Sequence, residues 1–283
     1  MDMGGCFGMS DKKLLKAGLQ VLFVLLMWLL CCTAGHAASM DAVWPESPGI
    51  DVKTDGKLVI DDSNMDKGYI MVRTSEPTSH AMKVTVSRDQ WQLIYDLNSE
   101  GEYEAFPLQN GSGDYEFALF ENVKGKKFSS EGKVVLNAQL YTEDAAYLVP
   151  NQYVSYELWT SAVQKSDEIC AGMAPDQAFQ AVSDFISSEF AYDFVRAKTI
   201  SSGEKPDIDY CYDNRMGICQ DLAAVTACML RVQGVPTRLV IGYADKYYHA
   251  WNTALVNGEE IFFDPTHAVG AIDAKKYQTE RMY

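Results

Sequence analysis

The sequence predicts an α+β protein in which a strand-rich first part precedes a part that mixes helices and strands. Short runs of β-type residues recur between about residues 51 and 153, with turn residues between several of them. After Pro150 the apolar residues recur at helical spacing instead. Near the C-terminus, Asn257-Gly258 separates two apolar runs, which is a strong signal for a β-hairpin.

The strand-rich part carries six short β-type runs, and their spacing favours a small antiparallel sandwich or sheet. The runs cover residues 57–60, 69–72, 82–86, 91–95, 115–119 and 134–138. Asp55-Gly56, Asn110 to Gly113 and Glu131-Gly132 supply turn residues between some of them. No chemical motif falls in this region. We therefore interpret residues 38–155 as a β-rich support or recognition domain.

Residues 1–37 have the pattern of an export signal. Lys12, Lys13 and Lys16 precede an unbroken apolar run from Val21 to Cys32, and small residues follow up to Ala38. Twelve apolar residues extend only about 18 Å as a helix, less than the roughly 30 Å core of a bilayer. We predict cleavage near Ala37 and a secreted or cell-surface protein. An uncleaved membrane anchor is the second alternative, and lipid attachment at Cys31-Cys32 is the third, because Leu29-Leu30 before them make a poor attachment motif.

The composition allows two folded domains and narrows the choice of partners. The 283 residues are 47% apolar and 12% aromatic, enough for a real core. The formal charge of -15 repels nucleic acid and acidic membrane surfaces, so neither is expected as a partner. Any membrane contact would run through the N-terminal segment. The expected partner is a peptide or protein substrate, and a cell-wall peptide is one open choice.

The second part, residues 156–283, contains three predicted helices. Ser161–Gly172 and Pro175–Phe190 have helical spacing, and the second has an apolar stripe that we assign to the core. A third helix begins at Cys219 and ends before the Gly234-Val235-Pro236 stop signal. A strand, 238–243, follows it.

Four cysteines remain beyond the signal segment. Cys219 and Cys228 would lie about 13 Å apart on opposite faces of one helix, so we do not expect them to pair. For Cys170 and Cys211, a disulfide and two buried free thiols both stay open. No CxxC motif and no pair of histidines at ligand spacing is present, so no metal site and no cofactor is predicted.

Cys219 has the surroundings of a reactive thiol. At the first turn of its helix it faces unpaired backbone N–H groups and the positive end of the helix dipole, and both favour the thiolate. Its own N–H is placed to bind a developing oxyanion. The preceding Gly217 suits a tight turn where backbone approaches substrate.

The predicted hairpin brings a histidine to a carboxylate. With a two-residue turn at Asn257-Gly258, Val256 faces Glu259 and Asp264 lies opposite Trp251. His249 is then on the same face as Trp251 and diagonal to Asp264, about 7–8 Å away at Cα. A slip of one residue would separate them. The register alone therefore predicts a His249–Asp264 contact.

A thiol, an imidazole and a carboxylate thus follow one another in the chain as Cys219, His249 and Asp264, the parts of an activated sulfur nucleophile. A lone buried cysteine or strand histidine is usually structural, and Asp before Pro is usually a turn. It is their joint arrangement that favours catalysis. His80 and His267 are the other histidines beyond the signal segment, and His267 competes for the role of base.

Gly217-x-Cys219-Gln220-Asp221, His249-Ala-Trp-Asn and Asp264-Pro-Thr resemble the three signature blocks of the transglutaminase-like superfamily. The resemblance extends from about Pro175 to Thr266 and includes Tyr192-Asp193, and it suggests an exported, bacterial-type member. It implies a papain-like core, with the Cys-bearing helix packed on an antiparallel sheet. Two positions depart from the pattern, since Thr253 stands where many members have an acid and Ile261-Phe262 where many have a tryptophan.

The implied chemistry is acyl transfer through a Cys219 thioester. His249 would act as acid and base, and Asp264 would fix its tautomer. Gln220 and Tyr212 are candidates for the second oxyanion donor, and Trp251 for a substrate contact. With water as acceptor the protein is a cysteine peptidase or amidase, which we favour because the sequence has no visible calcium loop. With a lysine amine as acceptor it is a transglutaminase. A non-catalytic binding module with the same fold is the third alternative.

Overall fold

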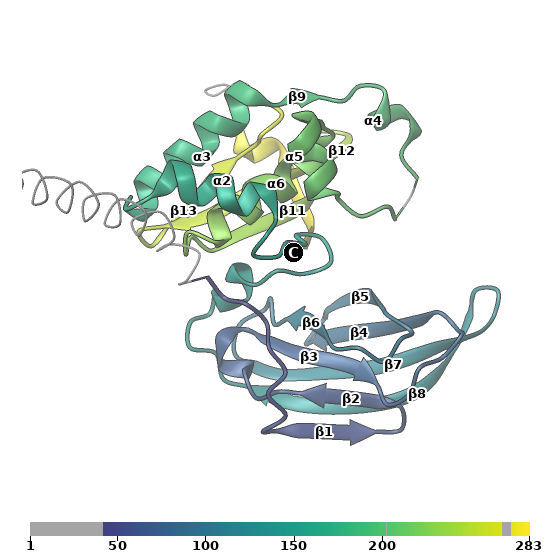
Figure 1. Cartoon of the computed structure of the whole chain (residues 1–283). Coiled ribbons are helices and arrows are strands. Elements are labelled where there is room, and N and C mark those ends of the chain that lie inside the picture. The colour runs from purple at the N-terminus through teal and green to yellow at the C-terminus, as the bar shows by residue number, and fades with distance from the viewer. Residues whose placement is uncertain (1–41, 202, 268–272) are drawn as a thin grey trace, which may run out of the picture.

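The computed structural model describes residues 42–201, 203–267 and 273–283, so the predicted export signal lies outside the described residues. A strand-rich part and a part of helices and strands are joined by a connecting segment, residues 139–160, which is teal in Figure 1. Within the described ranges, no helix is long and apolar enough to cross a membrane.

Two four-stranded antiparallel sheets make up the strand-rich part. In order across the sheets, the first contains β1 (Val52–Asp55), β2 (Leu58–Asp61), β3 (Tyr69–Thr74) and β6 (Glu104–Pro107), and the second β5 (Trp91–Leu97), β4 (Met82–Arg88), β7 (Gly113–Lys124) and β8 (Lys127–Ala138). Apolar side chains from both sheets belong to one buried core, including Ile70 and Val72 from β3 and Val84 from β4. Tyr69 and Met71, on the other face of β3, pack against Val149 of the connecting segment. The predicted β-rich, sandwich-like region is confirmed.

One predicted turn is wrong, and two strands were not predicted. Glu131-Gly132 lies inside β8, where the pairing with β7 skips Glu131, and the hairpin turn comes earlier, between Lys124 and Lys127. At this irregularity the Glu131 carbonyl accepts a hydrogen bond from Lys57 N–H at 2.7 Å. A side chain at position 132 would collide with the Asp55 backbone. Gly132 therefore allows the β1–β2 hairpin to approach β8. In the sequence, a glycine with this role cannot be distinguished from a glycine in a turn. The missed strands, β1 and β6, are short.

In its described residues, the second part combines five helices with a third four-stranded antiparallel sheet. The helices are α2 (Ser161–Cys170), α3 (Pro175–Glu189), α4 (Arg196–Thr199), α5 (Ile208–Asn214) and α6 (Cys219–Arg231). The sheet has the order β13 (Glu259–Phe263), β12 (Tyr247–Val256), β11 (Thr237–Ala244) and β14 (Tyr277–Met282), while β9 (Ala191–Tyr192) and β10 (Met216–Gly217) form a short parallel pair. Short 3-10 turns occur in all described regions of the chain: η1 (Met65–Lys67) in the strand-rich part, η2 (Ala145–Leu148) in the connecting segment and η3 (Ala274–Lys276) before β14.

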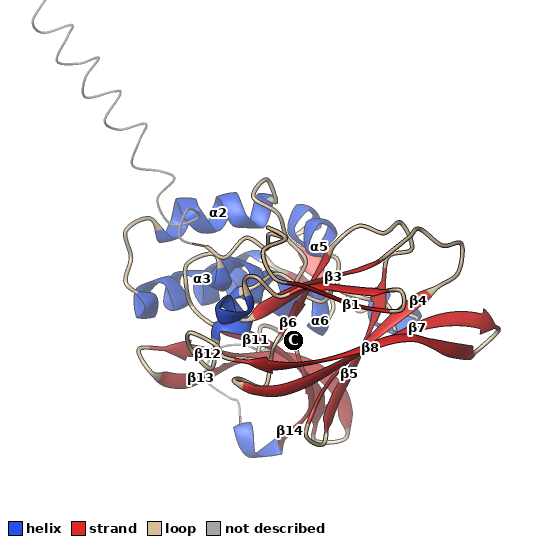
Figure 2. Ribbon diagram, turned by 90° about the horizontal axis from the view of Figure 1, so that it is seen from below, coloured by secondary structure: helices blue, strands red, loops and turns tan. Residues whose placement is uncertain are grey.

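Helix α6 is the centre of this part, and every residue from Asp221 to Arg231 is buried. It packs against β11 and β12 and against α2, α3 and α5. Figure 2 shows α2, α3 and α6 on one side of β11, β12 and β13. The predicted fold, a Cys-bearing helix packed on an antiparallel sheet, is confirmed. The domain boundary placed between residues 155 and 156 stays a prediction.

The two parts meet around a buried arginine and the last strand. Arg231 is fully buried and donates to the carbonyl oxygens of Val149 at 2.6 Å, Thr237 at 2.9 Å and Tyr283 at 2.7 Å. The Tyr283 ring stacks on Tyr153 with centroids 3.6 Å apart. Figure 1 shows the C-terminus between the two parts. Arg231 thus joins α6, the connecting segment, β11 and the end of the chain.

All four cysteines of the described residues carry free thiols. Cys170, Cys211 and Cys228 are buried, and burial raises the pKa of Cys170 to about 11 and that of Cys211 to about 12. Burial also raises the pKa of Cys228. These three thiols therefore stay protonated at neutral pH. Cys219 is only partly buried.

Candidate active site

Cys219 is the first residue of α6. Ile218 before it is extended, with φ -87° and ψ 177°, and its N–H donates to Asp221 Oδ2 at 3.0 Å. This contact is half of a capping box and fixes the entry of the chain into the helix. The thiol is therefore placed where free N–H groups and the helix dipole stabilise negative charge.

The backbone before Cys219 pairs with a distant segment of the chain. Gly217 of β10 lies beside Tyr192 of β9, and Asp193 N–H donates to Gly217 O at 2.9 Å. A side chain at position 217 would crowd Cys211 Sγ at 2.6 Å and Asp221 Cβ at 2.8 Å. Packing therefore explains Gly217 without the approach to substrate that the sequence suggested. The pairing also brings the Tyr192 hydroxyl to the Cys219 N–H, from which it accepts a hydrogen bond.

The β12–β13 hairpin has the predicted register. Val256 faces Glu259 and Asn252 faces Phe263, and both turn residues have positive φ, Asn257 at 52° and Gly258 at 84°. These two angles match the turn type that Asn-Gly favours. His249 Nε2 lies 2.7 Å from Asp264 Oδ2. The predicted His249–Asp264 contact is confirmed.

His249 connects the carboxylate to the thiol. Because Nε2 faces Asp264, Nδ1 is the ring nitrogen left for a second partner, and the side chain forms a hydrogen bond with Cys219. Only 12% of the His249 side chain is exposed, and the Asp264 side chain is fully buried. A thiol, an imidazole and a carboxylate thus form one hydrogen-bonded series that starts at a helix N-terminus.

Asp264 is held by several donors. Its Oδ2 accepts from the Tyr277 hydroxyl at 2.8 Å and lies 2.9 Å from His267 Nδ1 as well as near His249. Its Oδ1 accepts from Thr266 N–H at 3.0 Å and from Thr266 Oγ1 at 2.7 Å. Burial alone would raise the pKa of Asp264, but the hydrogen bonds and the charge of His249 lower it well below its usual range. The carboxylate therefore stays ionised and fixed in orientation.

The pKa of His249 gives a prediction for the pH dependence of stability. Burial alone would lower this pKa, but the hydrogen bonds to Asp264 and Cys219 outweigh burial and raise it from 6.5 to about 9. The folded protein then binds more protons than the unfolded chain between these values. The contribution of His249 is complete below pH 6.5 and is lost as the pH rises through about 9.

We expect the free energy of unfolding to fall across this pH window in the wild type. Urea denaturation of the wild type and of His249→Gln, measured at several pH values, isolates the effect of this histidine. The difference in stability between the two proteins should shrink as the pH rises from 6.5 to 9. A difference that stays constant over this range would contradict the raised pKa.

The remaining residues of the His-Ala-Trp-Asn block support this arrangement. Trp251 is buried, and its ring stacks on His249 with centroids 6.4 Å apart and an interplanar angle of 25°. Asn252 donates to Ala223 O on α6 at 2.9 Å and to Arg238 O on β11 at 3.1 Å. The strand that carries His249 is thereby fixed to the helix that carries Cys219. Trp251, expected as a substrate contact, lies beneath the imidazole.

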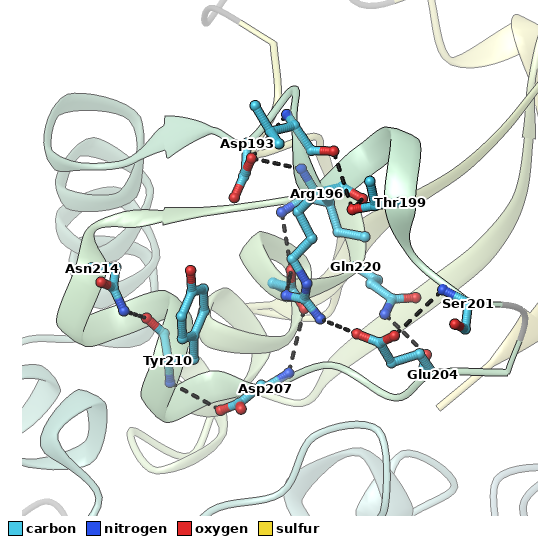
Figure 3. A network of polar contacts seen from close by, with 12 residues as sticks. Asp193, Arg196, Thr199, Ser201, Glu204, Asp207, Tyr210, Asn214 and Gln220 are labelled. Atoms are coloured by element: carbon cyan, nitrogen blue, oxygen red, sulfur yellow. Dashed lines mark hydrogen bonds and ion pairs between the residues drawn. The ribbon is translucent and has the colours of Figure 1, made fainter.

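A polar network ties the segment from residue 193 to 207 to the start of α6 (Figure 3). Arg196 donates to the buried Asp221 at 2.5 Å and to Glu204 at 2.8 Å. Asp207 N–H also points to Asp221, at 3.4 Å. Burial raises the pKa of Asp221, while Ile218 N–H and Arg196 oppose that rise. This network fixes the segment beside Cys219.

The two residues proposed from sequence as a second oxyanion donor have other partners. Gln220 donates through Nε2 to Glu204 O at 3.1 Å, as Figure 3 shows. Tyr212 is largely buried, and the Arg215 guanidinium lies 3.9 Å from its ring centroid. The Tyr192 hydroxyl lies at the Cys219 N–H instead. The sequence placed Tyr192 in the family pattern but gave it no role.

This constellation on a helix and an adjoining antiparallel sheet defines a papain-like thiol site. Residues 164–265 match the model of the transglutaminase-like superfamily. No curated protein matches the sequence.

Three solved structures are similar to this chain at low sequence identity. A candidate cysteine protease from Cytophaga hutchinsonii is 17% identical, with a TM-score of 0.41 over 76% of this chain and 83% of that chain. The periplasmic domain of TgpA from Pseudomonas aeruginosa is 16% identical, with a TM-score of 0.33 over 78% and 77%. Red sea bream transglutaminase is 12% identical, with a TM-score of 0.31 over 70% and 47%.

Proposed function

We propose that the protein is a thiol-dependent acyl-transfer enzyme, a cysteine peptidase or amidase that works through a thioester at Cys219. One observation carries the proposal: His249 hydrogen-bonds both to Asp264 and to Cys219, at the N-terminus of a buried helix. An imidazole held in this way can move a proton between a thiol and a leaving amine.

The reaction has two halves. The Cys219 thiolate attacks the amide carbon, a C–S bond forms, and the carbonyl electrons move to oxygen. The oxyanion then collapses, the C–N bond breaks, and protonated His249 gives its proton to the leaving amine. In the second half His249 takes a proton from water, whose oxygen attacks the thioester. The C–S bond breaks, the acid product leaves, and the thiolate is restored.

The oxyanion lies between two donors in this proposal. One is the Cys219 N–H and the other is the Tyr192 hydroxyl, which accepts a hydrogen bond from that N–H. Burial raises the pKa of Tyr192, so the hydroxyl keeps its proton and can donate it to the oxyanion. A preorganised pair of donors stabilises charge that appears only in the transition state.

Tyr192→Phe should lower kcat by about 10²-fold, since loss of one oxyanion donor costs about 10²–10³-fold in related chemistry. Steady-state kinetics on an amide substrate measure this change, and KM should change little because the donor acts in the transition state. Tyr210→Phe is the matched control, because Tyr210 lies on α5 and is 44% exposed. An unchanged kcat in Tyr192→Phe would remove Tyr192 from the mechanism.

Water is the acceptor that we favour. A cavity of about 360 Å³ adjoins His249 and is lined by polar groups that include Asp245, Asp273 and Lys276. Such a cavity gives water access to the imidazole that must activate it. The two carboxylates in the same lining would also attract an ammonium group, and this favours a lysine amine as second candidate acceptor.

A glutamine-containing peptide, with and without a primary amine, separates the candidates. Mass spectrometry of the products measures hydrolysis as a glutamate product and transfer as an amine adduct. Hydrolysis that exceeds amine incorporation supports the peptidase or amidase. Faster amine incorporation would make the protein a transglutaminase. If neither product exceeds that of Cys219→Ala across a peptide panel, the non-catalytic binding module replaces both.

The substrate and the location form part of the same proposal. An export signal at residues 1–37 would place the site outside the cytoplasm, secreted or at the cell surface, where peptides and proteins, including cell-wall peptides, are available. Detection of a mature chain that begins near Ala38 in the exported fraction tests this. Retention of the full-length chain in a membrane fraction would favour the anchor.

A further inference from the structure

We propose that His249, Asp264 and His267 form a binding site for a zinc-like divalent ion, and that the bound ion inhibits the enzyme reversibly. The binding is independent of the reaction, whereas the inhibition depends on the proposed acyl-transfer function. The two histidines lie far apart in sequence, so their spacing gave no metal signature. The fold brings both imidazoles to one carboxylate oxygen.

The geometry is close to that of a metal site. One ligand atom from each of the three residues lies within 4.8 Å of the others. His249 Nε2 is 2.7 Å and His267 Nδ1 is 2.9 Å from Asp264 Oδ2. Ligand atoms around a tetrahedral zinc ion, with bonds of about 2.0–2.1 Å, lie about 3.3 Å apart. To hold the ion, the two nitrogen–oxygen distances must lengthen by about 0.5 Å, and the two imidazole nitrogens, which lie within 4.8 Å of each other, must come to about 3.3 Å.

The site is open on one side and braced on the other. His267 has 52% of its side chain exposed, and the cavity beside His249 is lined by both imidazoles and Tyr277. An ion can enter from this cavity and keep water or the Tyr277 oxygen as a fourth ligand. Thr266 binds the far carboxylate oxygen of Asp264 and fixes its orientation. Metal-binding carboxylates commonly have such a supporting hydrogen bond.

The ligand types select the ion. Two imidazole nitrogens and one carboxylate oxygen suit Zn²⁺ and neighbouring transition ions, whereas Mg²⁺ and Ca²⁺ prefer oxygen alone. Asp245 and Asp273 in the cavity lining and the charge of -15 on the whole chain favour cations in general.

Metal binding would stop the proton transfers of the mechanism. His249 Nε2 would leave Asp264 for the ion, and the positive charge would oppose protonation at Nδ1. The imidazole could then neither stabilise the Cys219 thiolate as imidazolium nor protonate a leaving amine. Removal of the ion by a chelator would restore both functions.

Calorimetric titration with Zn²⁺ and absorption spectroscopy with Co²⁺ test the binding on the whole folded chain. Wild type and Cys219→Ala should each bind one ion, and the Co²⁺ complex should lack thiolate charge-transfer absorption. His267→Asn keeps a hydrogen-bonding side chain but removes a ligand. It should weaken binding by about 100-fold, because loss of a supporting residue alone costs about 10–100-fold.

His80→Asn is the matched control. His80 also contacts a carboxylate, with Nδ1 2.9 Å from Glu121 Oε1, but it lies in the strand-rich part. Its replacement should leave zinc affinity unchanged. Loss of binding in Cys219→Ala would identify the thiol as the ligand and overturn the site. Full affinity in His267→Asn, or no saturable binding in the wild type, would overturn it as well.

Labelling of Cys219 by a thiol-reactive electrophile needs no substrate. The labelling rate therefore measures the effect of zinc on the thiol independently of the proposed acyl-transfer reaction. Saturating Zn²⁺ should slow labelling of the wild type by at least about ten-fold, and a chelator should reverse the effect. In His267→Asn the same zinc concentration should have little effect, relative to the zinc-free rate of that variant. If zinc binds but does not slow labelling, the inhibition is overturned. If the wild type turns over no substrate, the acyl-transfer proposal fails and no reaction remains to be inhibited, but zinc binding and its effect on labelling stand.

Discussion

Replacing Cys219 by Ala should lower the rate of acyl transfer by about 10⁴-fold or more, to the level left by binding and oxyanion contacts alone. Cys219 supplies the atom that bonds to the acyl group, and the other three described thiols are buried and protonated. Product formation from an amide substrate, followed by mass spectrometry, measures the loss.

The control for this prediction is to compare the rate losses of the two single variants with that of the double variant. Cys219 and His249 act as one unit, so His249→Ala should cost about as much as Cys219→Ala, and the double variant scarcely more. The melting temperature of Cys219→Ala should stay close to that of the wild type, because the thiol is partly exposed. Activity that persists in folded Cys219→Ala would show that another group carries the reaction.

Replacing Arg231 by Met should lower the free energy of unfolding by about 3–5 kcal/mol. Methionine keeps much of the apolar stem but removes the donors to the carbonyls of Val149, Thr237 and Tyr283. A buried polar group that loses its partner costs about 1–3 kcal/mol, and here three lose a donor together. Urea denaturation of the purified chain measures the change.

Arg238→Met is the matched control for this loss. Arg238 forms ion pairs with Asp144 and Glu260, but its side chain is 24% exposed, and such pairs contribute only about 0–1 kcal/mol. It should therefore destabilise the protein much less than Arg231→Met. If the two substitutions lowered the free energy of unfolding equally, the buried contacts of Arg231 would not be what stabilises the region where the two parts meet.

The hairpin of the candidate site could be predicted because its constraints are local. Asn257-Gly258 specifies the turn, the turn specifies the register, and the alternation of side chains places His249 on the same face as Asp264. The start of α6 was equally local, since a glycine, a cysteine and an apolar run follow one another directly. Short-range geometry thus determined most of the arrangement of Cys219, His249 and Asp264.

The other contacts of the site depend on pairing between distant segments. Tyr192 reaches Cys219 through the two-residue β9–β10 pair, which is too short to leave a periodic pattern. Tyr277 lies on β14, which returns to β11 and carries its hydroxyl to Asp264. His267 was noticed as a possible rival base, but its contact with Asp264 needed coordinates.

The strand-rich part shows a similar division between local and distant information. Short runs of β-type residues located six of the strands, whereas Gly132 was mistaken for a turn residue. Its role is to let another hairpin approach, and a single sequence does not distinguish the two uses of glycine.

In the proposed mechanism His249 and the start of α6 activate Cys219, and the rate of electrophile labelling measures this activation. Intact mass and peptide mapping follow the reaction of iodoacetamide with the wild type and with His249→Ala. We expect one adduct, at Cys219, formed at least about ten times faster than on free cysteine at neutral pH, and a marked slowing in His249→Ala. Labelling at the rate of a free thiol, unaffected by His249→Ala, would contradict it.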